Sequence, residues 1–299
     1  LGAISSKAFP ALETADIAAL STTQVAALST KQIMSMETAD IAALSASQMI
    51  NLPTAAIAAL STGQIAAIET EDIAALTTAQ INALKSAQIA ALTSTQFAAL
   101  TSMQITALST ASIAGLTTAQ VASLATDTVA ALSTAQVAAL STAAIAALTT
   151  DQVTAFTTTQ LGALTSKQVA ALETADLAAL SSSQVAAFST SAMAALSSAQ
   201  IMALEPADFT ALSTAQLGAI SSKAFPALET EDIAALSTTQ VAALSTKQIV
   251  SMETADIAAL TTAQTISLPT AAIAALSTGQ ITAIETEDIA ALTTAQINA

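Results

Sequence analysis

The chain lacks several residue types on which enzyme chemistry depends. Among its 299 residues there is no histidine, cysteine, tryptophan, tyrosine or arginine. These absences remove the commonest general base, the thiol nucleophile, the soft metal ligands and the guanidinium fork that binds phosphate. We therefore predict that the protein is not an enzyme and that it has no cofactor. Without cysteine there is also no disulfide framework to indicate a redox compartment.

Positive charge is scarce as well. Six lysines stand against twenty-one acidic residues, which gives a formal net charge of −15 at pH 7. A chain of this charge is repelled by phosphate backbones, so we expect no nucleic-acid partner. Hydrophobic residues make up 53% of the chain, but a polar residue interrupts them every four or five positions. No window therefore approaches the ~18 apolar residues of a membrane span, and we predict none.

What the chain does contain is one eight-residue repeat. Counted from Ser5, the sequence divides into octads such as ETADIAAL and STTQVAAL without an insertion or deletion. We label the octad positions a to h. Position b is almost always Ser or Thr, d is mostly Gln or Asp, e and h carry a large apolar residue, and f and g are mostly Ala. Such fixed self-similarity is typical of a repeat array.

The period of eight selects one backbone conformation. In a continuous α-helix each octad would be rotated by about 80° relative to the last, so no apolar stripe would form. In a strand, e and h would face opposite sides, and Ala is a poor strand former. In one short helix per octad, e and h share a face, and a Ser or Thr at b or a caps the start with Gln or Asp close to a capping box. The predicted helix caps are Thr14, Thr22 and Thr134.

A helix of about six residues is not stable alone, because isolated helices need about 12 to 15 residues to be even marginally stable. Neighbouring octads must therefore cover its apolar face. We predict an all-α solenoid, a superhelix of very short helices with one helix per octad and one continuous, filled core. The predicted core residues are Ile17, Leu20, Val25, Leu28, Ile57, Leu60, Val137 and Leu140. In the two AFPAL octads, Pro10 and Pro226 stand at f, where we expect an irregular turn.

The acidic residues follow a second period. Ten octads contain acidic residues. One gap between two successive acidic octads spans seven octads, and we count it as two steps. The acidic octads then cover thirty-four octads in ten steps, or about 3.4 octads per step. A superhelix with 3.4 octads per turn would place these acids on one side, as i, i+3 and i+7 form a stripe on a helix. The predicted acidic line consists of Glu13, Glu37, Glu69, Glu173, Glu229, Glu253 and Glu285. Five of the six lysines lie six residues before such a Glu, and we expect them to form charge pairs between adjacent helices beside the acidic line.

A third period concerns the domain organisation. Residues 217–299 repeat residues 1–83 with eight differences, at an offset of 216 residues or 27 octads. At 3.4 octads per turn this is about eight turns, so the same surface would return to nearly the same side. We predict that residues 1–299 form a single continuous octapeptide-repeat solenoid, a fragment of a longer chain. Identical patches at constant spacing favour self-association into filaments or bundles.

Two kinds of ligand surface are weaker alternatives. The ETED segments at Glu69–Asp72 and Glu285–Asp288 bring three carboxylates into four residues, and carboxylate oxygens are ligands for Ca²⁺. A solvated helix start explains the same residues, so no metal ligand is assigned. Regular Thr residues are also found in ice-binding proteins, although a structural role at the helix start accounts for them here.

The run LSTAQVAALSTAAIAALTT resembles the octapeptide tracts of giant, repetitive bacterial surface or secreted proteins of the STAQIAAL type, and the similarity extends along the whole chain. The resemblance implies an extracellular or cell-surface location and a very large parent protein. We therefore expect a structural protein that forms a rigid solenoid rod of an extracellular filament or fibre. The alternatives are a stalk or spacer of a giant adhesin, and a repeat surface that binds calcium or ice.

Overall fold

The computed structural model describes residues 4–299. The chain divides into two compact units, Leu1–Leu148 and Thr149–Ala299. The first three residues of the predicted solenoid lie outside the described part of the chain. That residues 1–299 form one continuous solenoid stays a prediction.

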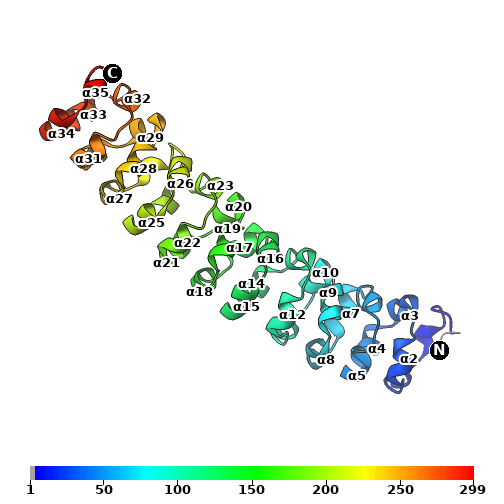
Figure 1. Cartoon of the computed structure of the whole chain (residues 1–299). Helices are drawn as coiled ribbons and strands as arrows, with labels where there is room; N and C mark the ends of the chain where they lie inside the picture. The colour runs from blue at the N-terminus through cyan, green and yellow to red at the C-terminus, as the bar shows by residue number, and fades with distance from the viewer. Residues whose placement is uncertain (1–3) are drawn as a thin grey trace. The chain divides into compact units, whose positions relative to one another are not determined.

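Every octad of the described chain carries one short helix (Figure 1). In the first unit these are η1 (Phe9–Ala11), α1 (Thr14–Ala18), α2 (Thr22–Ala26), α3 (Thr30–Ser35), α4 (Thr38–Ala42), α5 (Ala46–Met49), α6 (Thr54–Ile57), α7 (Thr62–Ala67), α8 (Thr70–Ala75), α9 (Thr78–Ala83), α10 (Ser86–Ala90), α11 (Ser94–Ala98), α12 (Ser102–Thr106), α13 (Thr110–Ile113), α14 (Thr118–Ala122), α15 (Thr126–Ala131), α16 (Thr134–Ala139) and α17 (Thr142–Ala146).

The second unit contains α18 (Thr150–Thr154), α19 (Thr158–Gly162), α20 (Ser166–Val169), α21 (Thr174–Ala179), α22 (Ser182–Val185), α23 (Thr190–Met193), α24 (Ser198–Ile201), α25 (Pro206–Ala211), α26 (Thr214–Ala219), η2 (Phe225–Ala227), α27 (Thr230–Ala235), α28 (Thr238–Ala242), α29 (Thr246–Ser251), α30 (Thr254–Ala258), α31 (Thr262–Thr265), α32 (Thr270–Ile273), α33 (Thr278–Ala283), α34 (Thr286–Ala291) and α35 (Thr294–Ile297). Residues 4–299 contain no β-strand. The predicted all-α fold with one short helix per octad is confirmed.

Each helix begins after position a and ends at g or earlier. Ser133 at a is extended, with φ −69° and ψ 156°, and its Oγ accepts a hydrogen bond from the Gln136 backbone N–H at 3.2 Å. In return the Gln136 Oε1 accepts from the Ser133 backbone N–H at 2.9 Å, which completes a capping box. Leu140 at h is not helical, with ψ 136°, and this residue directs the chain into the next octad.

The predicted caps Thr14, Thr22 and Thr134 are wrong by one position. Each of them is the first helical residue, and the cap is the preceding residue at a. The cap must have an extended backbone so that its side-chain oxygen can reach the N–H three residues on, and position b is already helical. Thr14 instead donates a hydrogen bond from Oγ1 to the Asp40 Oδ1 of another octad, at 3.2 Å.

This assignment predicts unequal effects of two neighbouring substitutions. Ser133→Ala removes the cap and is expected to destabilise the helix by about 1 kcal/mol. Thr134→Ala, on the exposed first helical residue, is expected to cost less than about 0.5 kcal/mol. Urea denaturation of the two variants compares them directly, and an equal or larger effect at Thr134 would contradict the assignment.

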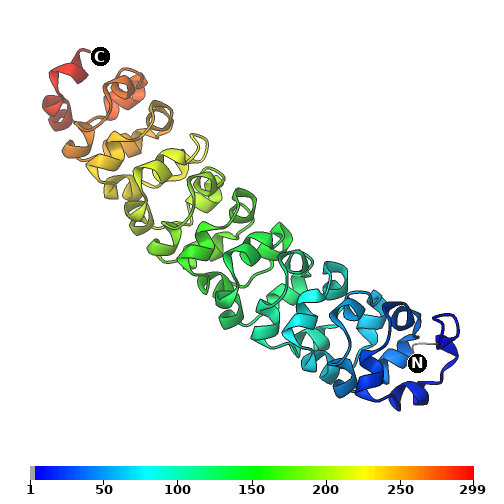
Figure 2. The same ribbon diagram turned by 45° about the vertical axis from the view of Figure 1, so that its right-hand side comes forward.

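Successive turns of each unit pack on one another (Figure 2). Helices three octads apart are in contact, for example α4 with α7 in the first unit and α30 with α33 in the second. Hydrogen bonds also join residues four octads apart, as described below. Since the nearest neighbours are both three and four octads away, one turn holds between three and four octads, in agreement with the prediction.

The core consists of the side chains at e and h. Ile57 and Val137 at e are fully buried, and Leu60 and Leu140 at h are 4% exposed. Ile17, Val25 and Leu28 are buried as well, so seven of the eight predicted core residues are confirmed. Leu20 is only half-buried.

The two prolines at f have the expected local effect. Octads 5–12 and 221–228 form the 3₁₀ helices η1 and η2 in place of an α-helix, and Pro10 and Pro226 each occupy an early position in them. A proline has no N–H to continue an α-helix and fits the first turn. Phe9 and Phe225 at e still reach the core and are 1% exposed.

Candidate functional site

A ladder of glutamine amides joins the turns of each unit. Gln80 at d uses its Oε1 to accept from the Thr77 backbone N–H at 2.9 Å, within its own octad. Its Nε2 donates to the carbonyl oxygens of Met49 at 2.9 Å and Leu52 at 3.0 Å, four octads earlier. The same arrangement in the second unit joins Gln240 to Phe209 and Leu212 at 2.8 and 2.9 Å. Every polar atom of these buried amides is thus satisfied across two turns.

We define the glutamine ladder as the d-position glutamines whose Nε2 donates to carbonyl oxygens 28 to 31 residues earlier within the same unit. They are Gln32, Gln48, Gln64, Gln80, Gln88, Gln96, Gln104, Gln120 and Gln136 in the first unit, and Gln184, Gln200, Gln216, Gln240, Gln248, Gln264, Gln280 and Gln296 in the second. The sequence prediction gave Gln at d only a capping role. The sequence does contain a signal for the second role, donation to another turn. A capping box uses only the Oε1 of the glutamine and leaves the two N–H donors of the amide without a partner.

In the octads that begin with glutamate, aspartate replaces glutamine at d and changes the connection. Asp40 accepts from its own cap, the Glu37 backbone N–H, at 3.0 Å and from Thr14 Oγ1 at 3.2 Å. Asp176 accepts from Thr150 Oγ1 at 3.0 Å in the same way. An ionised carboxylate cannot donate to a carbonyl oxygen, so these octads are connected to the octad three earlier in place of the one four earlier.

Burial raises the pKa of three aspartates at position d. Asp232 is 3% exposed, and its desolvation is the main reason that its pKa is raised to about 6. The hydrogen bond from the Glu229 backbone acts in the opposite direction and lowers the pKa. The nearby charges of Glu229, Glu231 and Asp208 raise it further. Burial is also the main cause of the raised pKa values of Asp72 and Asp256.

These shifts predict that stability falls as the pH rises. Because the folded-state pKa of Asp232 is about 6 and its ordinary value 3.8, the folded protein binds more protons than the unfolded chain between these values. The stabilising contribution is fully present below pH 3.8 and is lost as the pH rises through about 6. The urea midpoint is therefore expected to be higher at about pH 5 than at about pH 7.5.

General repulsion among the many carboxylates acts in the same direction, so a matched variant is needed. Asp232→Asn keeps the side-chain size and removes the titration, and its urea midpoint is expected to change less between the two pH values. A midpoint that increases toward neutral pH in the natural chain would contradict the assignment.

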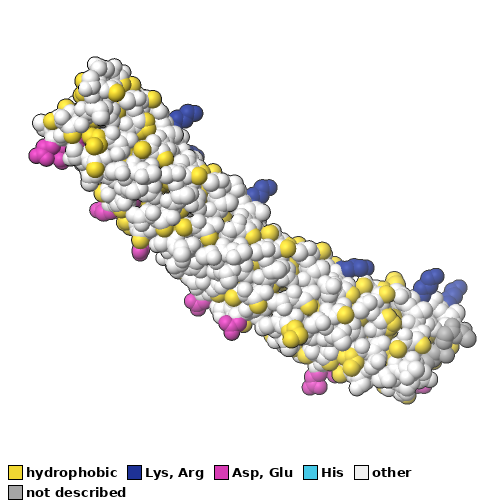
Figure 3. Space-filling view, viewed as in Figure 1, with side chains coloured by type: hydrophobic (Ala, Val, Ile, Leu, Met, Phe, Trp, Pro, Cys, Tyr) yellow, Lys and Arg dark blue, Asp and Glu magenta, His cyan; other side chains and the backbone are white. Residues whose placement is uncertain are grey.

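The structure brings several members of the predicted acidic line together. The helices that follow Glu13 and Glu37 are in contact, as α1 and α4. In the second unit α27, which follows Glu229, contacts α30, which follows Glu253. Glu69, Glu173 and Glu285 are exposed at the same octad position, and α21, which follows Glu173, contacts α18 of an acidic octad outside that list. The visible carboxylate side chains lie along one edge of each unit in Figure 3.

The expected pairing of lysines with the acidic line is wrong. The visible lysine side chains of each unit lie along the edge opposite the carboxylates (Figure 3). A lysine six residues before a glutamate belongs to the preceding octad, which is about a third of a turn away around the superhelix. Residues that are neighbours in space lie three or four octads apart. Lys7 and Lys31 are an example, because they are three octads apart and border the same surface hollow.

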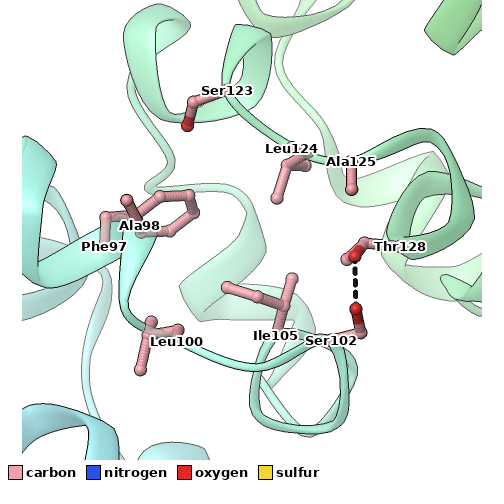
Figure 4. A pocket seen from close by; sticks show the side chains of 9 residues that line it. All are labelled: Phe97, Ala98, Leu100, Ser102, Ile105, Ser123, Leu124, Ala125 and Thr128. Atoms are coloured by element: carbon pink, nitrogen blue, oxygen red, sulfur yellow. Dashed lines mark hydrogen bonds between the residues drawn. The ribbon is translucent and has the colours of Figure 1, made fainter.

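One surface hollow interrupts the first unit where Thr128 stands at d in place of glutamine (Figure 4). It has a volume of about 160 Å³. The Thr128 Oγ1 bonds to the Ser102 Oγ at 2.7 Å and does not extend to the Leu100 carbonyl oxygen. Within residues 4–299 that carbonyl receives no hydrogen bond. The hollow is lined by Phe97, Ala98, Leu100, Ser102, Ile105, Ser123, Leu124, Ala125 and Thr128.

Restoring the repeat at this position is predicted to stabilise the first unit. Thr128→Gln places an amide where the ladder would donate to the Leu100 carbonyl, and one such hydrogen bond contributes about 1 kcal/mol. Thr128→Val, which loses the bond to Ser102 without reaching Leu100, is the matched control and is expected to destabilise. Thermal unfolding measures both, and a Gln variant less stable than the natural chain would contradict the explanation of the hollow.

Residues 4–299 contain no group of three or more acidic side chains arranged to hold a metal ion. The ETED segments form the starts of α8 and α34. Over the same residues, no helix has both the length and the apolar character needed to cross a membrane.

Comparison with known proteins found one family. The ALTTAQ repeat matches residues 9–36, 33–67, 65–102, 102–134, 129–166, 169–205, 225–254 and 249–283. A match such as 33–67 contains three complete octads and parts of two more, so it is slightly longer than one turn of the superhelix. A search of curated proteins found no match.

Proposed function

The chain belongs to the ALTTAQ repeat family, and from this premise we propose that it is a structural protein forming a solenoid rod of an extracellular filament or fibre. The extracellular or cell-surface setting rests on the resemblance to octapeptide tracts of giant bacterial surface proteins. The proposal concerns the chain's mechanical role, and it assigns no catalytic residue.

The glutamine ladder carries this proposal. Within each unit it connects turns through buried amides, and the e and h side chains fill the space between the same turns. Each turn thus makes the same two kinds of contact with its neighbours. Such an array can be lengthened without changing its cross-section, and its stability grows with the number of interfaces. This is the property that a filament needs.

Electron microscopy of the purified chain tests the proposal. We expect filaments of constant width whose axial repeat corresponds to one turn of three to four octads. A stalk or spacer would need only length and would stay monomeric. Particles that remain single at every protein concentration and ionic strength would therefore contradict the filament role and favour the spacer.

A further inference from the structure

The lysines form a line of their own. All six are exposed, and they occur in the first, fourth and eleventh octads of the first unit and in the twenty-first, twenty-eighth and thirty-first octads, in the second unit. These spacings of three and seven octads are one and two turns. Lys7, Lys31 and Lys85 form the lysine line of the first unit, and Lys167, Lys223 and Lys247 form the lysine line of the second unit.

The two charge lines do not satisfy each other within the chain. Residues 4–299 contain no hydrogen bond between a lysine and a carboxylate, and Figure 3 shows the two kinds of charge on opposite edges of each unit. Both lines are consequently available to another molecule.

We propose that a second copy of this chain docks side by side, with its acidic line on the lysine line of the first. This inference rests on the proposed filament role and adds the surface through which filaments associate. The exposed glutamates Glu13, Glu37, Glu173, Glu229 and Glu253 provide the negative side. A second copy fits because it carries the opposite charge at the same spacing of turns.

The contact uses two different surfaces, so it does not close on itself. Each copy that docks through its acidic line keeps a free lysine line for the next copy, and lateral growth continues. Acidic octads recur at nearly every turn, so a copy can slip by whole turns and still meet the lysines. The charge lines therefore select which faces meet.

Two charge-reversed variants of the 299-residue chain test the docking. The first changes Lys7, Lys31, Lys167, Lys223 and Lys247 to Glu. The second changes Glu13, Glu37, Glu173, Glu229 and Glu253 to Lys. Lysine is compatible with position a, because Lys85 already precedes α10 and its N–H donates to Gln88 Oε1 at 2.8 Å. Circular dichroism checks that both variants fold.

Lateral association is measured as filament width by electron microscopy and as the sedimented fraction. We expect each variant alone to lose lateral association by roughly tenfold or more, and an equimolar mixture to regain it, because acidic surfaces then meet basic ones. The mixture has the same mean net charge as the natural chain. The second variant also distinguishes docking through the charge lines from an effect of net charge. It is less negative than the natural chain, so it would associate more readily if net charge alone governed association.

Two results would overturn the docking. Equal widths for the natural chain and both variants would exclude the charge lines while leaving the filament role intact. A mixture of folded variants that fails to regain lateral association would do the same. Absence of filaments from the natural chain as well would overturn the proposed function together with the docking.

Discussion

Replacing Gln80 by glutamate is expected to destabilise the first unit by about 3 kcal/mol at neutral pH. The substitution preserves size and keeps the acceptor that caps α9. It removes the donor to the carbonyl oxygens of Met49 and Leu52 and places a negative charge against them. Gln80 is 2% exposed, so water cannot replace the lost partner. Hydrogen exchange of the backbone amides in residues 45–84 measures the local effect.

The matched control is Gln24→Glu. Gln24 is exposed, and within residues 4–299 its side chain bonds only to the Ser21 backbone N–H, so the same change should cost less than about 0.5 kcal/mol. In the Gln80→Glu variant, burial should also raise the pKa of the introduced carboxyl group, and its protonated form can donate to one carbonyl. Acidification should therefore recover part of the loss. Equal effects at both positions would show that the ladder does not hold the turns together.

Gly115→Ala is expected to destabilise the first unit by about 2 kcal/mol. A Cβ at this position would lie 2.5 Å from the Ser86 Cβ and 2.7 Å from its Cα, which belong to the octad three earlier. The glycine is needed for this close approach and not for its backbone angles, since its φ is negative. Chemical denaturation with urea measures the loss.

The reason for the close approach is the short side chain at d of the same octad. Ser112 bonds through Oγ to the Leu84 carbonyl oxygen at 2.5 Å, the acceptor that a ladder glutamine would reach. A serine reaches it only if the turns come closer. Ser112→Gln alone should therefore overpack the site, whereas the double variant with Gly115→Ala restores the usual spacing and should be more stable than either single variant. Additive losses in the double variant would contradict this coupling.

Much of the fold follows from the octad alone. Large apolar residues at e and h are three positions apart and share a face only in a helix, so the core residues Ile57 and Leu60 could be identified before the structure. The spacing of the acids predicted a turn of between three and four octads, because charged side chains must remain on the outside of a solenoid. The prolines at f likewise indicated the two irregular turns.

Other features depended on which octads become neighbours. The sequence did not decide whether Ser133 or Thr134 caps the helix, because both residue types cap helices. Only the backbone conformation at octad position a distinguishes the two. The lysine positions were misread because a lysine and the glutamate that follows it belong to adjacent octads, which are about a third of a turn apart around the superhelix. The hollow at Thr128 and the close approach at Gly115 likewise involve partners about 28 residues away.

The octad alone specifies the local unit, a capped helix with one apolar face, since capping and helical periodicity act within eight residues. What connects these units depends on how the chain winds. A glutamine amide has one acceptor used locally and two donors that must find buried carbonyls elsewhere, and the winding of the chain places those carbonyls 28 to 31 residues earlier. The same winding separates the lysines from the acids, because it converts distance along the chain into position around the superhelix.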